Sequence, residues 1–394
     1  MLRVAYLFER FPSFAQTFCY REVAELIRQG VEVAVFSIRR PVDEPTQDWD
    51  EKILRKVTYL PEEKELVAQV GRAVSRGALP EAAARSLKEW DRQTDFLRLY
   101  QAAFIGLRLQ GAGLRRVHAH FAGMAARTAY WLCHFFGIDY SLTAHANDIF
   151  APQDFVISLA KIFHGARAIV TVSDFAAEQL RREFPHEATK IRRVYNGVEL
   201  ERFSEAQFNS DIPLLISVGR LIEKKGISDL IAACDVLKRG GRKFRCEIIG
   251  EGPLEAALAR QIANGQLQDR VQLIGPQTQV EIAQRLAAAN LFVLPCVKEA
   301  GGGMDNLPTV IVEAMASGLP VISTPIAGIP EMVEPGLTGE LVPEHDPAAL
   351  AGAIAQLISQ PELARRLGSR GRQRAAEKFA IAANARTLME ILSY

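Results

Sequence analysis

Short apolar runs alternate with amphipathic helical segments along this chain. Residues 4–8 form the first apolar run, of the kind found in strands that are buried on both faces of a parallel sheet. Residues 16–29 follow with apolar side chains on one helical face, and Gly30 ends the segment. The same pattern then repeats, which predicts parallel sheets with helices on both faces.

The alternation occurs in two blocks, which a polar segment at residues 196–211 separates. We therefore predict two doubly wound α/β domains, over residues 1–200 and 210–375, followed by a final helix over 376–394. Residues 46–110 interrupt the first block. They are rich in Ala, Leu, Glu and Arg, lack clear strands, and are interpreted as a helical insertion. Ligands of such sheets bind beyond the carboxyl ends of the strands, so the site is expected between the domains.

The charge and cysteine content argue against several classes of function. Lysine and arginine number 47 against 46 aspartate and glutamate, a net charge of +1, which argues against a nucleic-acid-binding protein. The five cysteines are odd in number and form no Cys-x-x-Cys pair, so neither a disulfide framework nor a zinc site is expected. The start of the chain does not resemble a secretory leader and no apolar run has transmembrane length, which predicts a cytoplasmic protein.

One segment leaves two interpretations open. Residues 96–109 are apolar with scattered arginines. Such a segment is either a helix of the core or a basic amphipathic surface that contacts a membrane. The second interpretation would make the protein peripheral on the inner face of the cytoplasmic membrane.

A candidate phosphate site follows a predicted strand in the second block. The strand ends at Gly219, and Arg220 and Lys225 lie in the turn and at the start of the next predicted helix. Glycine lets a ligand approach the backbone, and a helix N-terminus favours anions. Two cations at this position suit a diphosphate, although taken alone they are equally typical of solvated surface charge.

A glycine-rich loop precedes a later helix of the same block. Residues 301–303 are three glycines, which free the loop to bring amide donors to a polar ligand, and Pro308 suits the first turn of the helix. Glu313 falls among apolar residues of that helix, where a carboxylate needs a partner such as a sugar hydroxyl. Asp305 lies at the end of the loop, eight positions earlier.

These motifs together resemble family 4 (GT4) of the retaining glycosyltransferases, in particular its exopolysaccharide or colanic-acid-type members. The matching residues of the second block are Gly219-Arg220 with Lys225-Gly226, Gly250-Glu251-Gly252-Pro253, the pair Asp305 and Glu313, Gly328-Ile329-Pro330-Glu331 and Gly336-Leu337-Thr338-Gly339. Those of the first block are His118-Ala119-His120-Phe121, Thr143-Ala144-His145-Ala146-Asn147-Asp148 and Tyr195-Asn196-Gly197-Val198. The resemblance implies the GT-B fold, in which an acceptor-binding and a donor-binding Rossmann-like domain face each other across a cleft. The last helix then returns to the first domain.

The resemblance also implies roles for residues of the donor site. Arg220 and Lys225 would neutralise the donor diphosphate. Glu313 would hold the nucleotide ribose, and Asp305 would contact hydroxyls of the donor sugar. Asp305 replaces the glutamate that usually begins the E-x7-E motif of the family, so the sugar or its contact differs here. The other implied donor-binding residues are Gly219, Gly252, Gly275, Pro276, Gly302, Gly303, Asn306 and Leu307.

Candidates for the acceptor side come from the first block. A histidine at a strand end is more often structural, but His145 matches the T-x-H-x-x-D motif of the family, which implies a contact with the donor sugar near the reaction centre. His120 is either an acceptor contact or a hydrogen-bonded buried histidine. The loop after the first strand resembles the F-P-x-x-S-E-T-F variant of exopolysaccharide transferases, with Ala15-Gln16 in place of Ser-Glu. It supplies Arg10 and Gln16 as acceptor-contact candidates.

We therefore predict a metal-independent, retaining glycosyltransferase that uses a nucleoside-diphosphate sugar and no cofactor. Its catalytic candidates are His145, Arg220, Lys225 and Asp305. The N-terminal loop and residues 96–109 favour a lipid-linked acceptor, a sugar on a polyprenyl diphosphate, in the synthesis of a surface polysaccharide; an oligosaccharide acceptor is the alternative. Two other functions stay open, a sugar-nucleotide epimerase on the same fold and a non-catalytic nucleotide-sugar-binding subunit.

Overall fold

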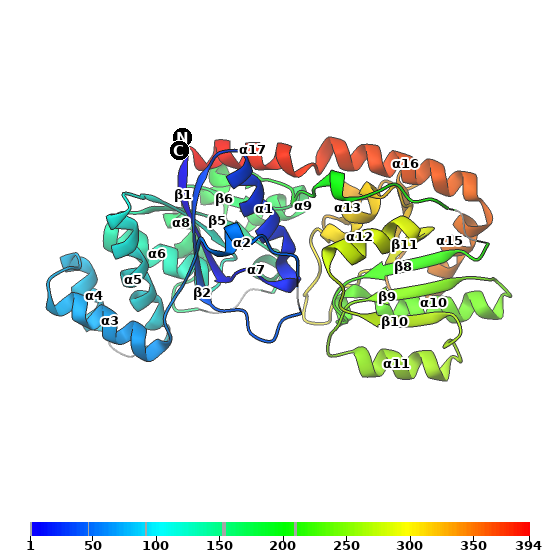
Figure 1. Cartoon of the computed structure of the whole chain (residues 1–394), viewed down its shortest axis with the longest axis horizontal. Helices are drawn as coiled ribbons and strands as arrows, with labels where there is room; N and C mark the ends of the chain where they lie inside the picture. The colour runs from blue at the N-terminus through cyan, green and yellow to red at the C-terminus, as the bar shows by residue number, and fades with distance from the viewer. Residues whose placement is uncertain (1, 46, 91–92, 152–154, 209–210) are drawn as a thin grey trace.

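The computed structural model describes residues 2–45, 47–90, 93–151, 155–208 and 211–394. Two domains lie side by side along the long axis of the molecule, and each is built on a parallel sheet (Figure 1). The predicted pair of doubly wound α/β domains is therefore present. Residues 46 and 210, at which the insertion and the second domain were predicted to begin, lie outside the described residues.

The first sheet has the strand order β3-β2-β1-β4-β5-β6-β7, with parallel pairing throughout. Its central strands are apolar because helices cover both faces, α1 and the last helix of the chain, α17 (Ile381–Leu392), on one and α5 and α6 on the other. The strands are β1 (Arg3–Arg10), β2 (Glu32–Arg39), β3 (Val57–Tyr59), β4 (Arg116–His120), β5 (Asp139–Ala144), β6 (Ile169–Thr171) and β7 (Ile191–Arg193). The helices are α1 (Thr17–Arg28), α2 (Glu51–Leu54), α3 (Glu63–Ser75), α4 (Glu81–Trp90), α5 (Leu97–Gly111), α6 (Met124–Phe136), α7 (Ala146–Phe150), α8 (Leu159–Gly165) and α9 (Asp174–Glu183).

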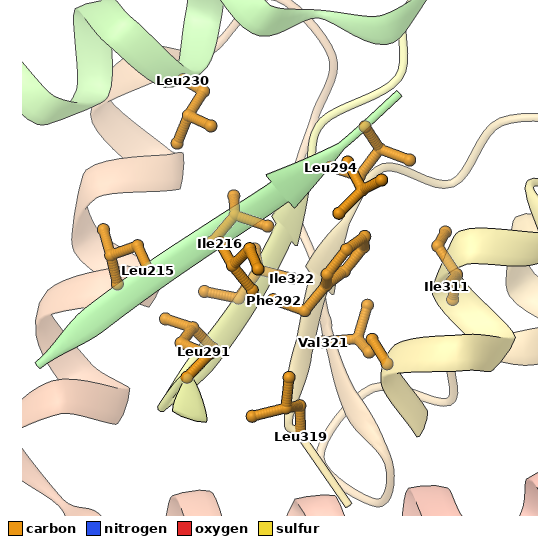
Figure 2. Close-up of a cluster of buried hydrophobic side chains, with 14 of the residues drawn as sticks. Leu215, Ile216, Leu230, Leu291, Phe292, Leu294, Ile311, Leu319, Val321 and Ile322 are labelled. Carbon is orange, nitrogen blue, oxygen red and sulfur yellow. The ribbon is translucent and has the colours of Figure 1, made fainter. Parts of the chain in front are cut away.

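The second sheet has the strand order β10-β9-β8-β11-β12-β13, again parallel. Figure 2 shows its core, where Ile216 of β8, Phe292 of β11 and Ile311 of α13 are buried. The strands are β8 (Leu214–Val218), β9 (Arg245–Ile249), β10 (Val271–Gly275), β11 (Leu291–Leu294), β12 (Val321–Ser323) and β13 (Gly339–Leu341). The helices of this domain are α10 (Ile227–Arg239), α11 (Glu255–Asn264), α12 (Gln279–Ala288), α13 (Thr309–Ala316), α14 (Ile329–Met332), α15 (Pro347–Ser359) and α16 (Pro361–Lys378).

The segment at residues 46–110 contains a strand that the sequence did not reveal. Here β3 pairs with β2 at the edge of the first sheet. Val57, Thr58 and Tyr59 are each only half-buried, so this edge strand lacks the apolar run by which buried strands are recognised. The expectation of a purely helical insertion was therefore wrong.

The apolar segment at residues 96–109 is a core helix. It forms α5, which packs on α6 and buries Leu99, Phe104, Ile105 and Leu109. An amphipathic membrane surface would need these side chains exposed, so the structure corrects the prediction of membrane contact through this segment. Among the described residues, no helix has both the length and the apolar character needed to cross a membrane.

The last two helices connect the domains. Figure 1 shows α16 along the second domain and α17 beside α1 in the first, so the predicted return of the last helix is confirmed. Between them the chain pairs with the segment that links the domains. The Val198 N–H donates to the Phe379 carbonyl oxygen at 2.9 Å, and the Ile381 N–H donates to the Val198 carbonyl oxygen at 3.1 Å. A Cβ on Gly197 would lie 2.4 Å from the Ile381 Cα, so only glycine fits at this crossing.

We expect Gly197→Ala to lower the free energy of unfolding by roughly 1–3 kcal/mol, because the added methyl group would force the two crossing segments apart. The control is Gly71→Ala inside α3, where a Cβ would meet nothing within 4 Å. It is expected to raise the free energy of unfolding by about 0.5–1 kcal/mol. Urea unfolding measures both changes, and a Gly197→Ala protein as stable as the wild type would contradict the crossing contact.

Candidate active site

Polar side chains of both domains meet beyond the carboxyl ends of β8 and β5. A 3-10 turn, Glu223–Lys225, follows β8 and brings two lysines to Asp305, which precedes α13. Lys225 Nζ lies 2.5 Å from Asp305 Oδ2, and Lys224 Nζ lies 3.7 Å from Asp305 Oδ1. Lys224 Nζ also donates to Asn147 Oδ1 at 3.2 Å, which joins this group to α7 of the first domain.

Lys225 and Asp305 keep each other ionised although both are buried. Burial would lower the pKa of Lys225, but the Asp305 carboxylate outweighs burial and the pKa is raised. Burial would raise the pKa of Asp305, but Lys225 and Lys224 outweigh it and the pKa is lowered. Cys296 lies with its Sγ 3.8 Å from Asp305 Oδ2, and burial together with this carboxylate raises the thiol pKa, so the thiol is neutral. Two cations share one carboxylate, which leaves net positive charge for an anionic ligand.

The turn after β8 is fixed by a glycine. Gly226 has φ 65°, and a Cβ there would lie 1.7 Å from the Pro295 carbonyl oxygen, just after β11. Residues other than glycine rarely adopt this backbone conformation, so the close approach requires Gly226. The approach in turn fixes the position of Lys225 relative to β11. Arg220 is exposed in the same turn, and its charge contributes to the lowered pKa of Asp305.

The other residues predicted to bind the donor are buried to different extents. Asn306, Leu307 and Gly303 are buried and Gly302 is half-buried, all in the loop before α13. Gly275 and Pro276 lie at the carboxyl end of β10, half-buried and exposed respectively.

Two of the predicted donor glycines are explained by packing within the second domain. A Cβ on Gly252 would lie 2.6 Å from the Leu221 carbonyl oxygen. A Cβ on Gly219 would lie 3.3 Å from Lys225 Cδ. Gly252 therefore lets the backbone at Leu221 approach closely, and Gly219 makes room for the side chain of Lys225.

Asn306 joins the loop before α13 to the first domain. Ser173 Oγ donates to Asn306 Oδ1 at 2.5 Å, and the Gly328 N–H donates to the Asn306 carbonyl oxygen at 3.0 Å. The Nδ2 atom of Asn306 is buried with no hydrogen-bond partner within the part of the chain that the structure describes. A buried amide of this kind suits an oxygen atom of a bound ligand.

A carboxylate of the second domain caps a helix of the first. The N–H groups of Asp174 and Phe175, at the start of α9, donate to Glu331 Oε2 and Oε1 at 2.8 and 2.9 Å. The Tyr195 hydroxyl donates to Glu331 Oε2 at 3.0 Å. Glu331 therefore satisfies free N–H groups that the first turn of α9 would otherwise leave unpaired.

Glu313 forms a buried ion pair across the two domains. Arg21 Nη1 of α1 lies 2.7 Å from Glu313 Oε1, and the side chains are 3% and 5% exposed. The same guanidinium donates from Nε and Nη2 to Gln279 Oε1 at 3.3 and 3.1 Å. A ribose at Glu313 would therefore share this carboxylate with Arg21 or displace the guanidinium.

A chain of hydrogen bonds joins Glu22 to His145 inside the first domain. His120 Nε2 lies 3.0 Å from Glu22 Oε1, and His120 Nδ1 lies 3.1 Å from His145 Nε2. The Tyr6 hydroxyl donates to the same Glu22 oxygen at 2.8 Å. The His145 ring packs against Phe121, with the ring centroids 4.4 Å apart. His145, at the carboxyl end of β5, is thus positioned through His120.

His120 is the charged member of this chain. Burial would lower the pKa of His120, but Cys19 and Glu22 raise it to about 10. Burial and the neighbouring His120 cation lower the pKa of His145 well below its usual value, so His145 is neutral. His120 is fully buried and both its ring nitrogens have protein partners, which favours the buried-histidine interpretation, and its contact with the acceptor stays a prediction.

Among the described residues, one group has the spacing of metal ligands, namely Glu22, His118 and His120. The ring nitrogens of His118 lie 2.8 and 2.9 Å from the Ser141 and Thr143 hydroxyl oxygens. Glu22 and His120 hydrogen-bond to each other. These partners account for the cluster as a hydrogen-bonding network.

Arg10 and Gln16, the remaining acceptor candidates, flank the loop after β1. Arg10 Nη1 lies 3.1 Å from Glu44 Oε1, and the arginine side chain is 42% exposed. Gln16 is half-buried and immediately precedes α1. Both stay predictions for acceptor contact.

Comparison with known proteins identifies the family. Residues 15–202 match the model described as "Glycosyltransferase Family 4", and residues 199–374 match "Glycosyl transferases group 1". The chain is 30% identical, over 412 aligned positions that cover 99% of both proteins, to "Putative colanic acid biosynthesis glycosyltransferase WcaL" of Salmonella typhimurium. The chain belongs to glycosyltransferase family 4.

Two further comparisons concern this glycosyltransferase, one with part of its sequence and one with its whole fold. It is 45% identical over 177 residues to "Amylovoran biosynthesis glycosyltransferase AmsK" of Erwinia amylovora, which is 44% of this chain and 43% of the relative. The solved structure of Anabaena Alr3699/HepE in complex with UDP covers 100% of both chains at 18% identity, with a TM-score of 0.70. The predicted GT-B fold is thereby confirmed.

Three charged residues of the site were not predicted from the sequence. Arg21 and Glu22 are neighbours in α1, and Lys224 adjoins Lys225. Glu22 lies four positions after Phe18, which places both on one helical face. A carboxylate on an apolar helical face needs a partner, and this requirement was the signal in the sequence that could have identified Glu22.

Removing one member of the Arg21–Glu313 pair should strongly destabilise the glycosyltransferase. We expect Arg21→Met to lower the free energy of unfolding by ~3–5 kcal/mol, because the Glu313 carboxylate stays buried without its cation. The double variant with Glu313→Met should lie much closer to the wild type, since no charge is then left unpaired. The control Arg55→Met breaks an exposed pair with Glu51 and should change stability by less than about 1 kcal/mol. Urea unfolding tests this series, and a double variant as unstable as Arg21→Met would refute the charge explanation.

The Glu22–His120 pair makes the stability depend on pH. The pKa of His120 is raised from 6.5 to about 10, and the pKa of Glu22 is lowered from 4.5. The stabilisation by this pair is therefore complete between pH 4.5 and 6.5, is lost as the pH rises through about 10, and is lost on the acid side as the pH falls through the lowered pKa of Glu22. Glu22→Gln removes the carboxylate, and we expect the pKa of His120 to fall. Histidine NMR titration measures this change, with the exposed His186 as internal reference. An unchanged pKa of His120 in the variant would show that Glu22 is not the group that raises it.

Proposed function

We propose that this chain is a retaining, metal-independent transferase that moves a sugar from a nucleoside-diphosphate sugar to a glycan on a polyprenyl diphosphate, in the synthesis of a surface polysaccharide. The observation that carries the donor assignment is the meeting of Lys224 and Lys225 at Asp305, with Arg220 in the same turn. The relatives named for colanic acid and amylovoran synthesis support the pathway, and the UDP complex of HepE supports the donor class. Such an acceptor would bring the protein to the inner face of the cytoplasmic membrane.

The cations of this site would act on the charge that develops on the leaving diphosphate. In the transfer, the bond between the sugar C1 and the phosphate oxygen breaks, and C1 bonds to the acceptor oxygen on the same face. The acceptor proton passes to the leaving phosphate oxygen. Lys225 and Arg220 would stabilise the diphosphate as its negative charge grows, which is the form of catalysis that fixed charges supply best.

Asp305 would accept hydrogen bonds from hydroxyls of the donor sugar. Its ion pair with Lys225 would couple the sugar contact to the phosphate contact, because one side chain holds the other. The Nδ2 group of Asn306 would donate to an oxygen of the same donor. His145, neutral and held by His120, would line the first-domain side of the sugar.

The donor assignment predicts a loss of rate without a loss of fold. We expect Lys225→Ala to lower the turnover number by about 10²–10³-fold, because one contact to the developing charge is removed. The control Lys243→Ala alters an exposed lysine of the same domain and should keep the wild-type rate. Product formation and thermal shift are measured with UDP-, GDP-, ADP- and dTDP-sugars, with and without EDTA.

Each part of the proposal has its own contradicting result. Normal turnover in both Lys225→Ala and Arg220→Ala would overturn the phosphate assignment, and a loss of activity in EDTA would overturn metal independence. Inversion of the anomeric configuration, read from the NMR coupling constant of the product, would overturn the retaining outcome. Nucleotide-sugar binding without transfer would favour a binding subunit, and an altered sugar formed without acceptor would favour an epimerase.

A further inference from the structure

A second group of charges lies in the first domain, at the carboxyl ends of β1 and β2. We call it the arginine cluster, and it consists of Arg39, Arg98, Arg127, Glu9 and Asp95. Arg39 Nη1 lies 3.3 Å from Glu9 Oε1, and both of these side chains are partly exposed. Arg98 and Arg127 come from the first turns of α5 and α6. The cluster holds three cations and two carboxylates, and so carries a net positive charge.

One carboxylate serves both buried arginines of the cluster. Arg127 Nη1 lies 2.7 Å from Asp95 Oδ2, and Arg98 Nε lies 3.4 Å from Asp95 Oδ1. The Arg98, Arg127 and Asp95 side chains are 7%, 6% and 11% exposed. Two buried guanidinium groups thus share the Asp95 carboxylate, and Glu9, which is paired with Arg39, acts on both only through longer-range attraction. An excess of positive charge is unfavourable in a protein interior.

Arg98 is also short of hydrogen-bond acceptors. Its Nε and Nη1 atoms are buried and have no hydrogen-bond partner among the described residues. Burial lowers the pKa of Arg98 to about 10, although Asp95 opposes this. Buried arginine N–H groups are normally paired, so this side chain lacks the acceptors that an oxyanion would provide.

The arginine cluster lies on the same edge of the first sheet as His145. Arg127 is in the first turn of α6, which begins three residues after Phe121. The Phe121 ring packs on the His145 ring, with the centroids 4.4 Å apart. Strands β2 and β3 are added on one side of β1 and strands β4 to β7 on the other, so the strand order reverses between β1 and β4, and ligands of such sheets bind at this reversal. The cluster is therefore on the first-domain side of the candidate active site.

We propose that the arginine cluster binds an oxyanion of the acceptor, with Arg98 and Arg127 as paired donors and the more exposed Arg39 as the outer contact. The inference rests on the proposed transfer to an acceptor, and it names the chemistry of that acceptor. A guanidinium matches the geometry of both phosphate and carboxylate oxygens. The oxyanion is either the diphosphate of a lipid carrier or the carboxylate of an acidic sugar, and the two sources are separated by experiment.

Binding is measured by tryptophan fluorescence, which does not depend on sugar transfer. Trp131 lies one helical turn after Arg127 in α6, and its ring is 5.1 Å from that of Trp90. The probes are farnesyl diphosphate, farnesol and glucuronate. All proteins carry Lys225→Ala, so that a diphosphate is not held at the donor site. We expect farnesyl diphosphate or glucuronate to bind and farnesol to give no response.

Variants of the cluster test whether the oxyanion binds there. We expect Arg98→Gln to weaken binding by ~10–100-fold, because charge-assisted hydrogen bonds are lost. Arg39→Gln, at a side chain that is 52% exposed, provides a second variant if Arg98→Gln does not fold. Arg85→Gln is the matched control, at an exposed arginine of α4 that pairs with Glu81. Binding of farnesyl diphosphate alone identifies a phosphate, and binding of glucuronate alone identifies an acidic sugar.

The proposal is overturned if neither anion binds, or if Arg98→Gln and Arg39→Gln bind as tightly as the control. Its failure is distinguishable from failure of the proposed function. A transferase in which Arg98→Gln leaves the acceptor KM unchanged keeps the function and loses this site. Anion binding that depends on the cluster, in a protein that transfers no sugar, keeps the site and loses the function.

Discussion

The two domains are held together by backbone hydrogen bonds where the chain crosses between them twice. The linker at Val198 pairs with the segment between α16 and α17, and Gly197 allows these two segments to approach closely. α17 then packs on α1 in the first domain. The linker and the last helix therefore join the domains at one point, and side-chain contacts such as the Arg21–Glu313 pair join them at others.

The candidate active site consists of charges that are buried and must be paired. Asp305 serves Lys224 and Lys225, and Glu313 serves Arg21 from the other domain. In both places a carboxylate of the second domain is held by cations, and one of these ion pairs crosses between the domains. A buried charge without a partner is very unfavourable, so the ligand groups that enter must replace the contacts that they break. The arginine cluster differs, because there the described carboxylates leave an arginine without full pairing.

Much of the fold could be predicted from the sequence, since buried parallel strands and amphipathic helices have recognisable patterns. Lys225, Asp305 and Glu313 were found because motifs of the second domain are local in sequence. Arg21 was missed because its partner Glu313 lies 292 positions away, and no local pattern reports such a pair. β3 was missed because an edge strand lacks an apolar run. The environment of His120 could not be predicted, because its partners Glu22 and His145 come from separate segments and a sequence motif does not show that they meet.

The cap that Glu331 places on α9 bears on how this protein can be recombined with its relatives. The first N–H groups of a first-domain helix are satisfied by a carboxylate encoded in the second half of the gene. A chimera that joins this acceptor half to a foreign donor half must therefore supply a carboxylate at the same position. The halves are separate in sequence, but at this helix they are not independent modules, and exchange of donor specificity by domain shuffling is limited to partners that keep this residue.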